Sequence, residues 1–272
     1  MRIQPCAKIN LGLNIVARRA DGYHNLETVF YPVPIHDEIT IEERHDDGRS
    51  RCLLTMNGNP IDGDPEKNLV VRAYHQLAQR YSLPPITITL TKNIPMQAGM
   101  GGGSADGAFT LRLLNEMFQL GMTTEELEAA AVPLGADCAF FIQAKPAYAE
   151  GIGEILLPID LSLDNYSLAI VKPPIAVSTR EAFALISPKR PVQCCREVVM
   201  QPVETWRDRL TNDFEESIFP QYPAIGAIKE KLYDLGAVYA AMSGSGSALF
   251  ALFANQPESL HTYFPDCFTA VL

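Results

Sequence analysis

The 272-residue sequence lacks the features that mark several common classes of protein. No apolar run approaches the length of a membrane-spanning helix, and no signal peptide precedes the amphipathic pattern that starts by Ile3. The six cysteines include no CxxC pair, and the five histidines form no HExxH motif or other close pair. These absences argue against a membrane-anchored or secreted protein and against a structural zinc site, and they favour reduced thiols in a cytoplasmic protein.

The sequence also has fewer basic than acidic residues. The 22 lysines and arginines are outnumbered by 32 aspartates and glutamates, which gives a formal net charge of −10. This excess of negative charge argues against broad binding to nucleic acid or to an anionic membrane. A phosphorylated ligand would therefore have to be held by backbone amides, a few lysines and a metal ion. The composition is otherwise that of a globular protein of one large or two ordinary domains.

The most informative stretch is rich in glycine and covers residues 95–106. It follows the alternating segment 86–92, which is typical of a half-buried strand, and it precedes apolar residues at helical spacing that end at Gly121. Three consecutive glycines at 101–103 allow backbone amides to approach a ligand at a helix N-terminus, where anions bind. The order of strand, glycine loop and helix therefore predicts a phosphate-binding loop, with a flexible turn as the alternative.

Two better-known phosphate motifs do not match this loop. A Walker A motif would have a lysine before Ser104, where the sequence has Gly103. A dinucleotide-binding fingerprint would have glycine at position 104 and a buried, fully apolar strand before it. The loop on its own therefore predicts nucleotide binding, and it belongs to neither the Walker A class nor the dinucleotide-binding class.

Helices and strands are mixed along the chain without strict βαβ alternation, which predicts an α+β fold. Strand-like patterns cover residues 1–16, 26–43, 166–171, 238–242 and 248–253. Helices are expected to begin at Asn68, at a capping box of Thr123 and Glu126, and at Ser178 with Thr179, and a further helix through Ile225 is expected to end at Gly236. Residues 187–203 are expected to form a connector. Glycines at 151 and 153 place a boundary between domains 1–154 and 155–272.

Two charged residues are notable for their apolar surroundings. Lys8 lies among small and apolar residues of the first expected strand, although a strand lysine facing water is the simpler interpretation. Asp137 interrupts an apolar run over 129–142, where burial of a carboxylate is costly unless a cation or hydrogen bonds meet it. A helix N-cap or a structural ion pair would also explain Asp137. With the phosphate loop, the two residues suggest phosphoryl transfer, in which the aspartate acts as base and the lysine stabilises charge.

The chain resembles the GHMP kinase superfamily and, within it, the family of 4-diphosphocytidyl-2-C-methyl-D-erythritol kinases. The resemblance depends on segments in the family's order: 7–11 with 21–28 behind it, 95–106, 134–137 and 243–246. The glycine loop alone would identify only the superfamily, whereas Asp-Gly-Tyr-His at 21–24 narrows the substrate. Some positions depart from the family pattern without removing a catalytic group: Gln97, Ala98, Ala105 and Ala139.

The resemblance implies a two-domain fold with an N-terminal ATP-binding domain and the active site in the cleft between the domains. It implies phosphorylation of the 2-hydroxyl of cytidine diphosphate-linked methylerythritol, in the non-mevalonate route to isoprenoid precursors. Asp137 would be the base and Lys8 its charged partner. The residues implied to bind ATP are Asn68, Lys92, Pro95, Met96, Gln97, Ala98, Gly99, Met100, Gly101, Gly102, Gly103, Ser104 and Ala105.

For the acceptor substrate, the resemblance implies contacts from Asn10, Tyr23, His24, Thr179 and Phe183. His24 would hydrogen-bond the cytosine while Tyr23 and Phe183 stack on it, so that stacking supplies affinity and hydrogen bonds supply selectivity. Ordinary core packing is the alternative for the two aromatic residues.

ATP and Mg²⁺ are the implied cofactors, with Ser104 as a candidate magnesium ligand. The expected partners are small molecules, with neither nucleic acid nor membrane, and the chain is expected to be a cytoplasmic monomer or weak dimer. Two other functions stay open. The chain could be a GHMP kinase that acts on homoserine, mevalonate or a sugar, or a non-catalytic ligand-binding regulator on the same fold.

Overall fold

The structure is a computed structural model of residues 1–272, and it describes all of them except 46–47 and 60–62. It contains two compact units. The first consists of Met1–Ala7, Pro34–Ile94 and Gly101–Lys145, and the second of Lys8–Val33, Pro95–Met100 and Pro146–Leu272. The chain therefore passes between the units several times, and this division differs from the single boundary expected at residues 154 and 155. The glycines at 151 and 153 lie near only the last of these crossings, which is between Lys145 and Pro146.

Two long strands, β2 (Cys6–Arg18) and β3 (His24–His36), run from one unit into the other. The remaining helices and strands of the first unit are β1 (Arg2–Ile3), β4 (Glu38–Glu43), β5 (Cys52–Gly58), the 3₁₀ turn η1 (Pro65–Lys67), α1 (Leu69–Ala78), β6 (Ile86–Lys92), α2 (Gly102–Met117), α3 (Thr124–Ala131) and α4 (Cys138–Gln143).

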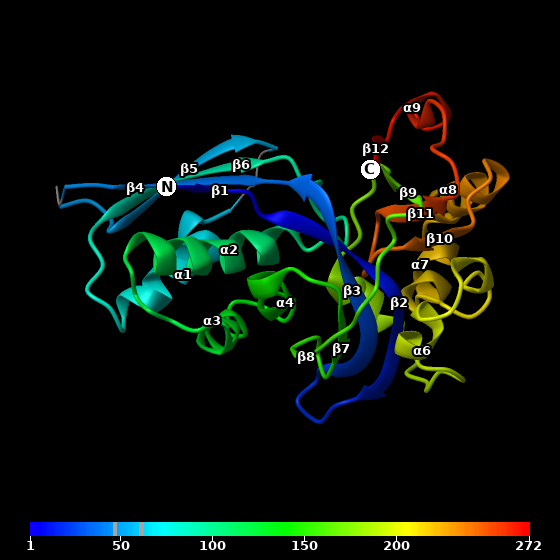
Figure 1. The fold of residues 1–272 in the computed structure, drawn as a ribbon, viewed down its shortest axis with the longest axis horizontal. Coiled ribbons are helices and arrows are strands. Elements are labelled where there is room, and N and C mark those ends of the chain that lie inside the picture. Colours follow the sequence, from blue (N-terminus) through cyan, green and yellow to red (C-terminus); the bar gives the residue numbers. More distant parts are fainter. Residues whose placement is uncertain (46–47, 60–62) are drawn as a thin grey trace. The chain divides into compact units, whose positions relative to one another are not determined.

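The first unit is a sheet covered by helices. Its strand order is β1-β4-β6-β5, with β6 antiparallel to β4 and parallel to β5. Helices α1 and α2 pack against each other along one side of this sheet, and α3 and α4 pack on α2 (Figure 1). The predicted alternation of β6 is confirmed, since Ile86, Ile88 and Leu90 are buried and the threonines between them are half-buried. Lys92 is the next residue on the buried side, which places a charged group under the glycine loop.

The second unit contains these further elements: β7 (Ala147–Glu150), β8 (Ile155–Pro158), β9 (Ser167–Lys172), α5 (Thr179–Ala184), α6 (Cys195–Val199), the 3₁₀ turn η2 (Val203–Thr205), α7 (Phe214–Gln221), α8 (Pro223–Asp234), β10 (Tyr239–Met242), β11 (Leu249–Phe253), α9 (Leu260–Tyr263) and β12 (Phe268–Val271). One antiparallel sheet has the order β10-β11-β9-β12, and the other has the order β2-β3-β7-β8. Helix α8 packs on β10 and β11, and α7 packs on α8.

Strand β2 carries buried apolar residues and buried polar residues in alternation. Its apolar residues alternate as predicted, and Leu13 and Ile15 join the core of β9, β10, β11, α7 and α8. The polar residues between them, Lys8, Asn10 and Asn14, are buried as well. A buried polar side chain needs hydrogen-bond partners, so this second face of β2 is where a network of polar contacts is expected.

Most of the expected elements are confirmed. The α+β class is correct, and α8, β9, β10 and β11 begin or end within about two residues of the predicted bounds, the usual uncertainty of an element end. The capping box is present, with Thr123 Oγ1 accepting from the Glu126 amide at 3.3 Å and the Glu126 carboxylate from the Thr123 amide at 2.9 Å. The connector expected over 187–203 is wrong in part, because α6 lies within it. Five helical residues are too few to produce a clear periodicity.

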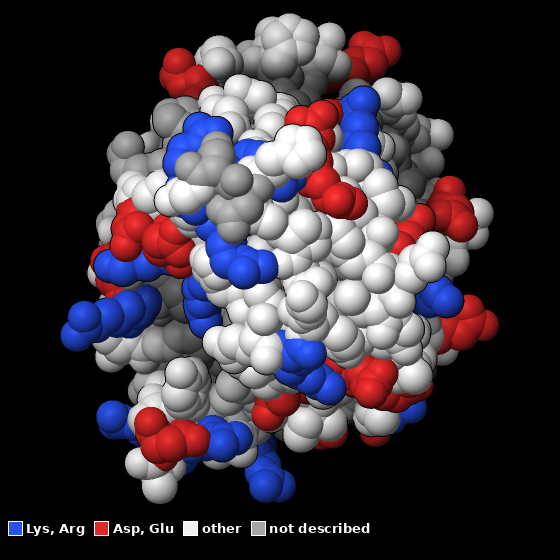
Figure 2. Space-filling model, turned by 90° about the vertical axis from the view of Figure 1, so that its left-hand side faces the viewer, with Lys and Arg blue, Asp and Glu red and all other residues white. Residues whose placement is uncertain are grey.

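Two further properties concern membrane-spanning helices and the distribution of surface charge. No helix of the described part of the chain is long and apolar enough to cross a bilayer. On the face seen in Figure 2, lysine and arginine side chains are interspersed with aspartate and glutamate side chains around uncharged surface.

Candidate active site

Lys8 lies at the centre of a buried polar network in the second unit. Its side chain is buried, with the ammonium donating to Asn10 Oδ1 at 2.6 Å and to the Gly99 carbonyl at 2.9 Å. Asn10 Nδ2 donates to Thr28 Oγ1 at 3.0 Å, and the Thr28 hydroxyl donates to the Gly12 carbonyl at 2.5 Å. These contacts exclude the simpler interpretation of Lys8 as a strand lysine facing water. They also give Asn10, expected to contact the substrate, a clear role in positioning the lysine.

The first half of the glycine loop is held by the same network. Ser243 Oγ donates to the Gly99 carbonyl at 2.9 Å, and the Ser247 and Ala248 amides donate to the Gln97 and Ala98 carbonyls, each at 3.2 Å. The glycine-rich segment over 243–246 therefore supports the loop directly. Sequence reasoning recognised this segment only as a family motif and did not predict its contact with the loop.

Gly99 cannot be replaced without disturbing this contact. Its φ is +71°, and an added Cβ would lie 1.9 Å from the Ser243 carbonyl oxygen. Left-handed backbone and close approach of another chain segment are the two conditions that require glycine. Gly99 is thus needed for the folding of the loop, whatever the loop binds.

The second half of the loop begins helix α2 in the first unit. Gly101 is the N-cap with φ +72°, and the first helical hydrogen bond runs from the Ala105 amide to the Gly101 carbonyl at 2.8 Å. The amides of Gly102, Gly103 and Ser104 precede this bond, so they lie at the end of the helix that attracts anions. Gly103 is exposed, and a Cβ added to it would meet no atom within 4 Å. The structure therefore has an open helix N-terminus where the sequence predicts phosphate binding.

A buried ion-pair cluster lies beneath this turn. Lys92, whose side chain is 1% exposed, pairs with Asp37 and with Asp106, the latter at 2.6 Å. Burial raises the pKa of Asp106 to about 8, with the Asp37 charge adding to the rise and Lys92 opposing it. Asp106 is then mostly protonated at neutral pH, and one lysine faces one carboxylate. The cluster is close to neutral, which is the least costly state for buried charges.

The same cluster fixes the start of α2. A Cβ added to Gly102 would lie 3.3 Å from Lys92 Nζ, so the ammonium is directly under the first turn. Lys92, expected to contact the nucleotide, is occupied by two carboxylates inside the unit. Its visible role is to position the glycine turn, and a nucleotide contact stays a prediction.

Asp137 stands at the N-cap position of α4 and is half-buried. Its side chain makes no capping hydrogen bond, so helix capping does not explain it. The segment around it touches the start of α2, because a Cβ added to Gly135 would lie 3.7 Å from Ser104 Oγ, and α4 packs on α2. Within the first unit, the fold thus brings the Asp137 segment beside the turn that is predicted to bind phosphate, a proximity that the sequence did not reveal.

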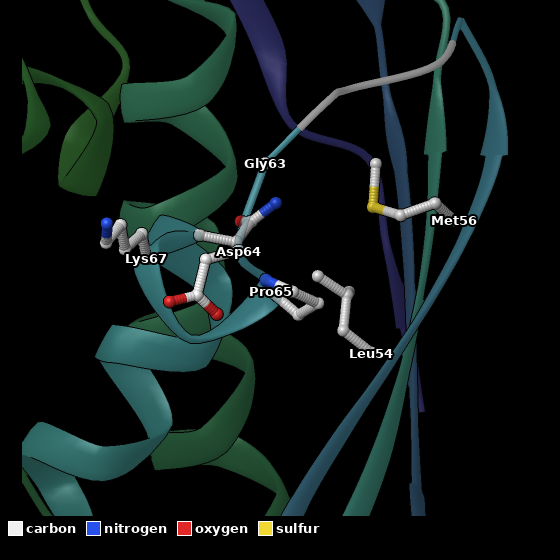
Figure 3. Close-up of a pocket in the computed structure, with 7 residues that line it drawn as sticks. Leu54, Met56, Gly63, Asp64, Pro65 and Lys67 are labelled. Carbon is white, nitrogen blue, oxygen red and sulfur yellow. The ribbon is translucent and has the colours of Figure 1, made fainter.

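Asn68, also expected near the nucleotide, caps α1 and lines a cavity. Its side-chain oxygen accepts from the Val70 amide at 3.1 Å. The cavity, of about 260 Å³, lies between β5 and η1, and Leu54 and Met56 project from β5 toward Asp64 and Pro65 (Figure 3). Apolar side chains together with a few polar groups are typical of a pocket for a small molecule.

The residues expected to bind the acceptor lie in the second unit. The His24 and Phe183 rings stack, with centroids 5.1 Å apart and planes 21° from parallel. Tyr23 is 60% exposed, which excludes core packing as its explanation, whereas Phe183 also packs edge-on against the core residue Phe214. Thr179 Oγ1 lies 3.1 Å from Ser245 Oγ. Burial lowers the pKa of His24, with the Arg18 charge adding to the effect, so its imidazole is neutral at physiological pH.

Two family models match the chain. The GHMP kinases N terminal domain matches residues 68–145, and the GHMP kinases C terminal domain matches residues 199–264. The first match begins at Asn68 and covers the α2 turn and Asp137, and the second covers the glycine segment at 243–246. These matches confirm the superfamily predicted from the motifs.

Similarity to individual proteins identifies the family within this superfamily. The chain is 54% identical over 266 residues to a 4-diphosphocytidyl-2-C-methyl-D-erythritol kinase of Bacteroides fragilis, covering 97% of this chain and 96% of the relative. A crystal structure of a 4-(cytidine 5'-diphospho)-2C-methyl-D-erythritol kinase matches with a TM-score of 0.84 at 28% identity, covering 100% and 98%. A homoserine kinase structure from Cytophaga hutchinsonii matches with a TM-score of 0.70 at 17% identity, covering 98% and 94%, and so shares the fold. The chain therefore belongs to the GHMP kinase superfamily and, within it, to the family of 4-diphosphocytidyl-2-C-methyl-D-erythritol kinases.

Proposed function

We propose that this protein transfers the γ-phosphoryl group of ATP to the 2-hydroxyl of 4-diphosphocytidyl-2-C-methyl-D-erythritol. The observation that carries the proposal is the 54% identity, over 97% of the chain, to a relative named for that reaction. Shared fold alone would not select the substrate, because a homoserine kinase has a similar structure.

The donor is assigned to the first unit. The triphosphate lies at the N-terminus of α2, where the amides of Gly102, Gly103 and Ser104 and the open space over Gly103 suit an anion. The adenine enters the cavity lined by Leu54, Met56 and Asn68, whose apolar strand side chains can cover the face of a base.

The residues at this turn also suit a magnesium ion. Mg²⁺ prefers oxygen ligands, keeps several waters and is usually held by few protein groups together with substrate phosphates. Ser104 offers a half-buried hydroxyl in the first turn of α2, beside the Asp137 segment. We assign Ser104 as the residue that would hold the ion, which when bound neutralises charge on the phosphates.

Asp137 acts as the general base and Lys8 stabilises charge. Asp137 accepts the proton of the 2-hydroxyl, the hydroxyl oxygen attacks the γ-phosphorus, and ADP leaves. Lys8 is suited to its role because burial and its hydrogen bonds to Asn10 and Gly99 hold the ammonium in one place, so little reorganisation is needed during the reaction.

The acceptor is assigned to residues of the second unit. The neutral His24 imidazole can hydrogen-bond the cytosine edge, and the exposed Tyr23 ring can stack on the base. Phe183 either stacks on the cytosine or, as its contact with His24 suggests, fixes the imidazole in the orientation that reads the base. Thr179, beside Ser245, supplies a further hydroxyl.

Release of ADP in the presence of ATP and Mg²⁺ tests this function, with the cytidyl substrate, homoserine and mevalonate as alternative acceptors. We expect turnover with the cytidyl substrate only. Turnover with homoserine or mevalonate alone would identify a different member of the superfamily, and nucleotide binding without turnover on any acceptor would indicate a regulator. Cytoplasmic location and a monomeric or weakly dimeric state stay predictions.

A further inference from the structure

A cluster of acidic and thiol groups lies in the second unit among residues to which the kinase reaction gives no role. Glu27 comes from β3, Tyr148 from β7, and Cys194 and Cys195 from the start of α6. The ligand atoms of Glu27, Cys194 and Cys195 all lie within 4.8 Å of one another. Residues far apart in the sequence thus bring two sulfurs and a carboxylate to one point.

The two carboxylates of the cluster share one hydroxyl donor. The Tyr148 hydroxyl lies 3.2 Å from Glu27 Oε2 and 3.3 Å from Glu150 Oε1, and its oxygen accepts from the Cys194 thiol at 3.4 Å. A hydroxyl has one proton, so it can donate to only one of the two carboxylates at a time. The other oxygen of the carboxylate, Glu27 Oε1, is buried and has no hydrogen-bond partner. A buried carboxylate oxygen without a partner is costly and requires an explanation.

The strand pairing adds a like-charge contact. Thr28 opposes Ala149 and Val29 opposes Tyr148 in the antiparallel pair of β3 and β7. One step further along this register, Glu27 and Glu150 oppose each other, an arrangement that is destabilising for two carboxylates.

Cys195 packs against the backbone of β2. A Cβ added to Gly12, which has φ +68°, would lie 2.9 Å from Cys195 Cβ and 2.6 Å from Leu210 Cδ1. The start of α6 therefore packs directly on the strand at a glycine. The Cys195 sulfur is thus carried by a residue packed against a strand, which is the kind of rigid support that a metal site needs.

We propose that Glu27, Cys194 and Cys195 form a binding site for a thiophilic divalent cation, with Zn²⁺ as the best fit. Two sulfurs and one carboxylate oxygen are ligands that zinc accepts, and the fourth position is left for water or the Tyr148 oxygen. With a zinc–sulfur bond of about 2.3 Å, tetrahedral ligands lie about 3.8 Å apart, so the three atoms need to close by about 1 Å or less. Binding releases the thiol protons to solvent and involves no oxidation.

The site would join α6 to β3 and β7. Glu27 lies three residues after His24 on β3, so an ion at Glu27 would also stiffen the strand that carries the proposed cytosine contact. The proposal does not depend on the kinase function, because its test measures the metal and needs no substrate.

Metal binding to the full-length protein provides the test. The reduced, chelator-treated protein, with its six thiols confirmed, is titrated with Zn²⁺ in competition with a chromophoric chelator, and with Cd²⁺ while sulfur-to-cadmium charge-transfer absorption is recorded. We expect one ion per chain and a charge-transfer band. Cys194→Ser and Glu27→Gln are expected to weaken binding by at least about tenfold, in line with the loss of a ligand or its close support.

Cys267→Ser is the matched control, because Cys267 is a partly buried cysteine of the same unit that lies outside the cluster. It should bind like the unmodified protein. A thermal melt in excess chelator shows whether each variant is folded. If Cys194→Ser does not fold, Glu27→Gln still tests the proposal. The proposal would be overturned if the protein fails to take Zn²⁺ from the competing chelator. It would also be overturned if the Cys194→Ser and Glu27→Gln variants bind Zn²⁺ as tightly as the unmodified protein does.

Discussion

Two substitutions in the buried cluster under the glycine turn should have very different costs. Lys92→Met keeps the volume but leaves Asp37 without its cation, and removing one partner of a buried ion pair typically costs about 3–5 kcal/mol. Asp106→Asn replaces a carboxyl that is mostly protonated at neutral pH with a neutral group of the same shape. We expect it to cost about 1 kcal/mol at pH 7.5, the size of one altered hydrogen bond.

The pH dependence of stability provides a second, independent readout. The pKa of Asp106 is raised from 3.8 to about 8 in the folded protein, so between these values the folded state holds a proton that the unfolded state has released. The contribution of Asp106 to stability is therefore full below pH 3.8 and is lost as pH rises toward 8. The free energy of unfolding of the unmodified protein, minus that of Asp106→Asn, should fall by up to about 1.4 kcal/mol per pH unit in this window.

Urea unfolding at pH 5.5, 6.5 and 7.5 measures both effects. Far-ultraviolet circular dichroism follows the whole chain, and the fluorescence of the single tryptophan, Trp206, reports on the second unit as an internal control. The reasoning is refuted if Asp106→Asn costs as much as Lys92→Met at pH 7.5, or if the difference between the unmodified protein and Asp106→Asn does not change with pH.

Three further predictions concern catalysis and binding. Asp137→Asn should lower kcat by about 10²–10⁴-fold, the usual contribution of a general base, with little change in ATP affinity, and near-normal turnover would exclude Asp137 as the base. His24→Ala should raise KM for the cytidyl substrate far more than KM for ATP, and equal changes would place His24 outside the cytosine site. Gly103→Ala should leave the melting temperature unchanged or slightly higher, because the added Cβ meets no protein atom and alanine favours the helix, but it should raise KM for ATP by about tenfold or more through contact with the phosphates. An unchanged KM in Gly103→Ala would place the phosphates elsewhere.

Local sequence patterns were sufficient to predict the elements around the glycine turn at the start of α2. The alternation of 86–92 predicted β6, and the glycines predicted an open N-terminus for the helix that follows. The same alternation also places Lys92 on the buried side of β6, directly after Leu90. That register was available in the sequence and would have predicted a buried lysine with acidic partners, although not which acids.

The partners themselves could not be predicted from local patterns. The contacts of Gly99 with Ser243 and of Lys92 with Asp37 join residues 144 and 55 positions apart. Helical and strand periodicities describe faces of single elements and contain no information on which faces meet. The repeated passage of the chain between the two units has the same cause, since composition breaks at Gly151 and Gly153 mark only one place.

The position of the new phosphate tests the central claim most directly. After reaction of the protein with Mg²⁺-ATP and the cytidyl substrate, proton-coupled ³¹P NMR of the product should show a new phosphomonoester signal beside the intact diphosphate. Carbon 2 of the acceptor bears the methyl branch and no hydrogen, so phosphate on the 2-hydroxyl gives a signal without three-bond coupling to a proton. A monoester signal split by such coupling would place the phosphate on another hydroxyl, and the absence of any new phosphorus signal would contradict the proposed function itself.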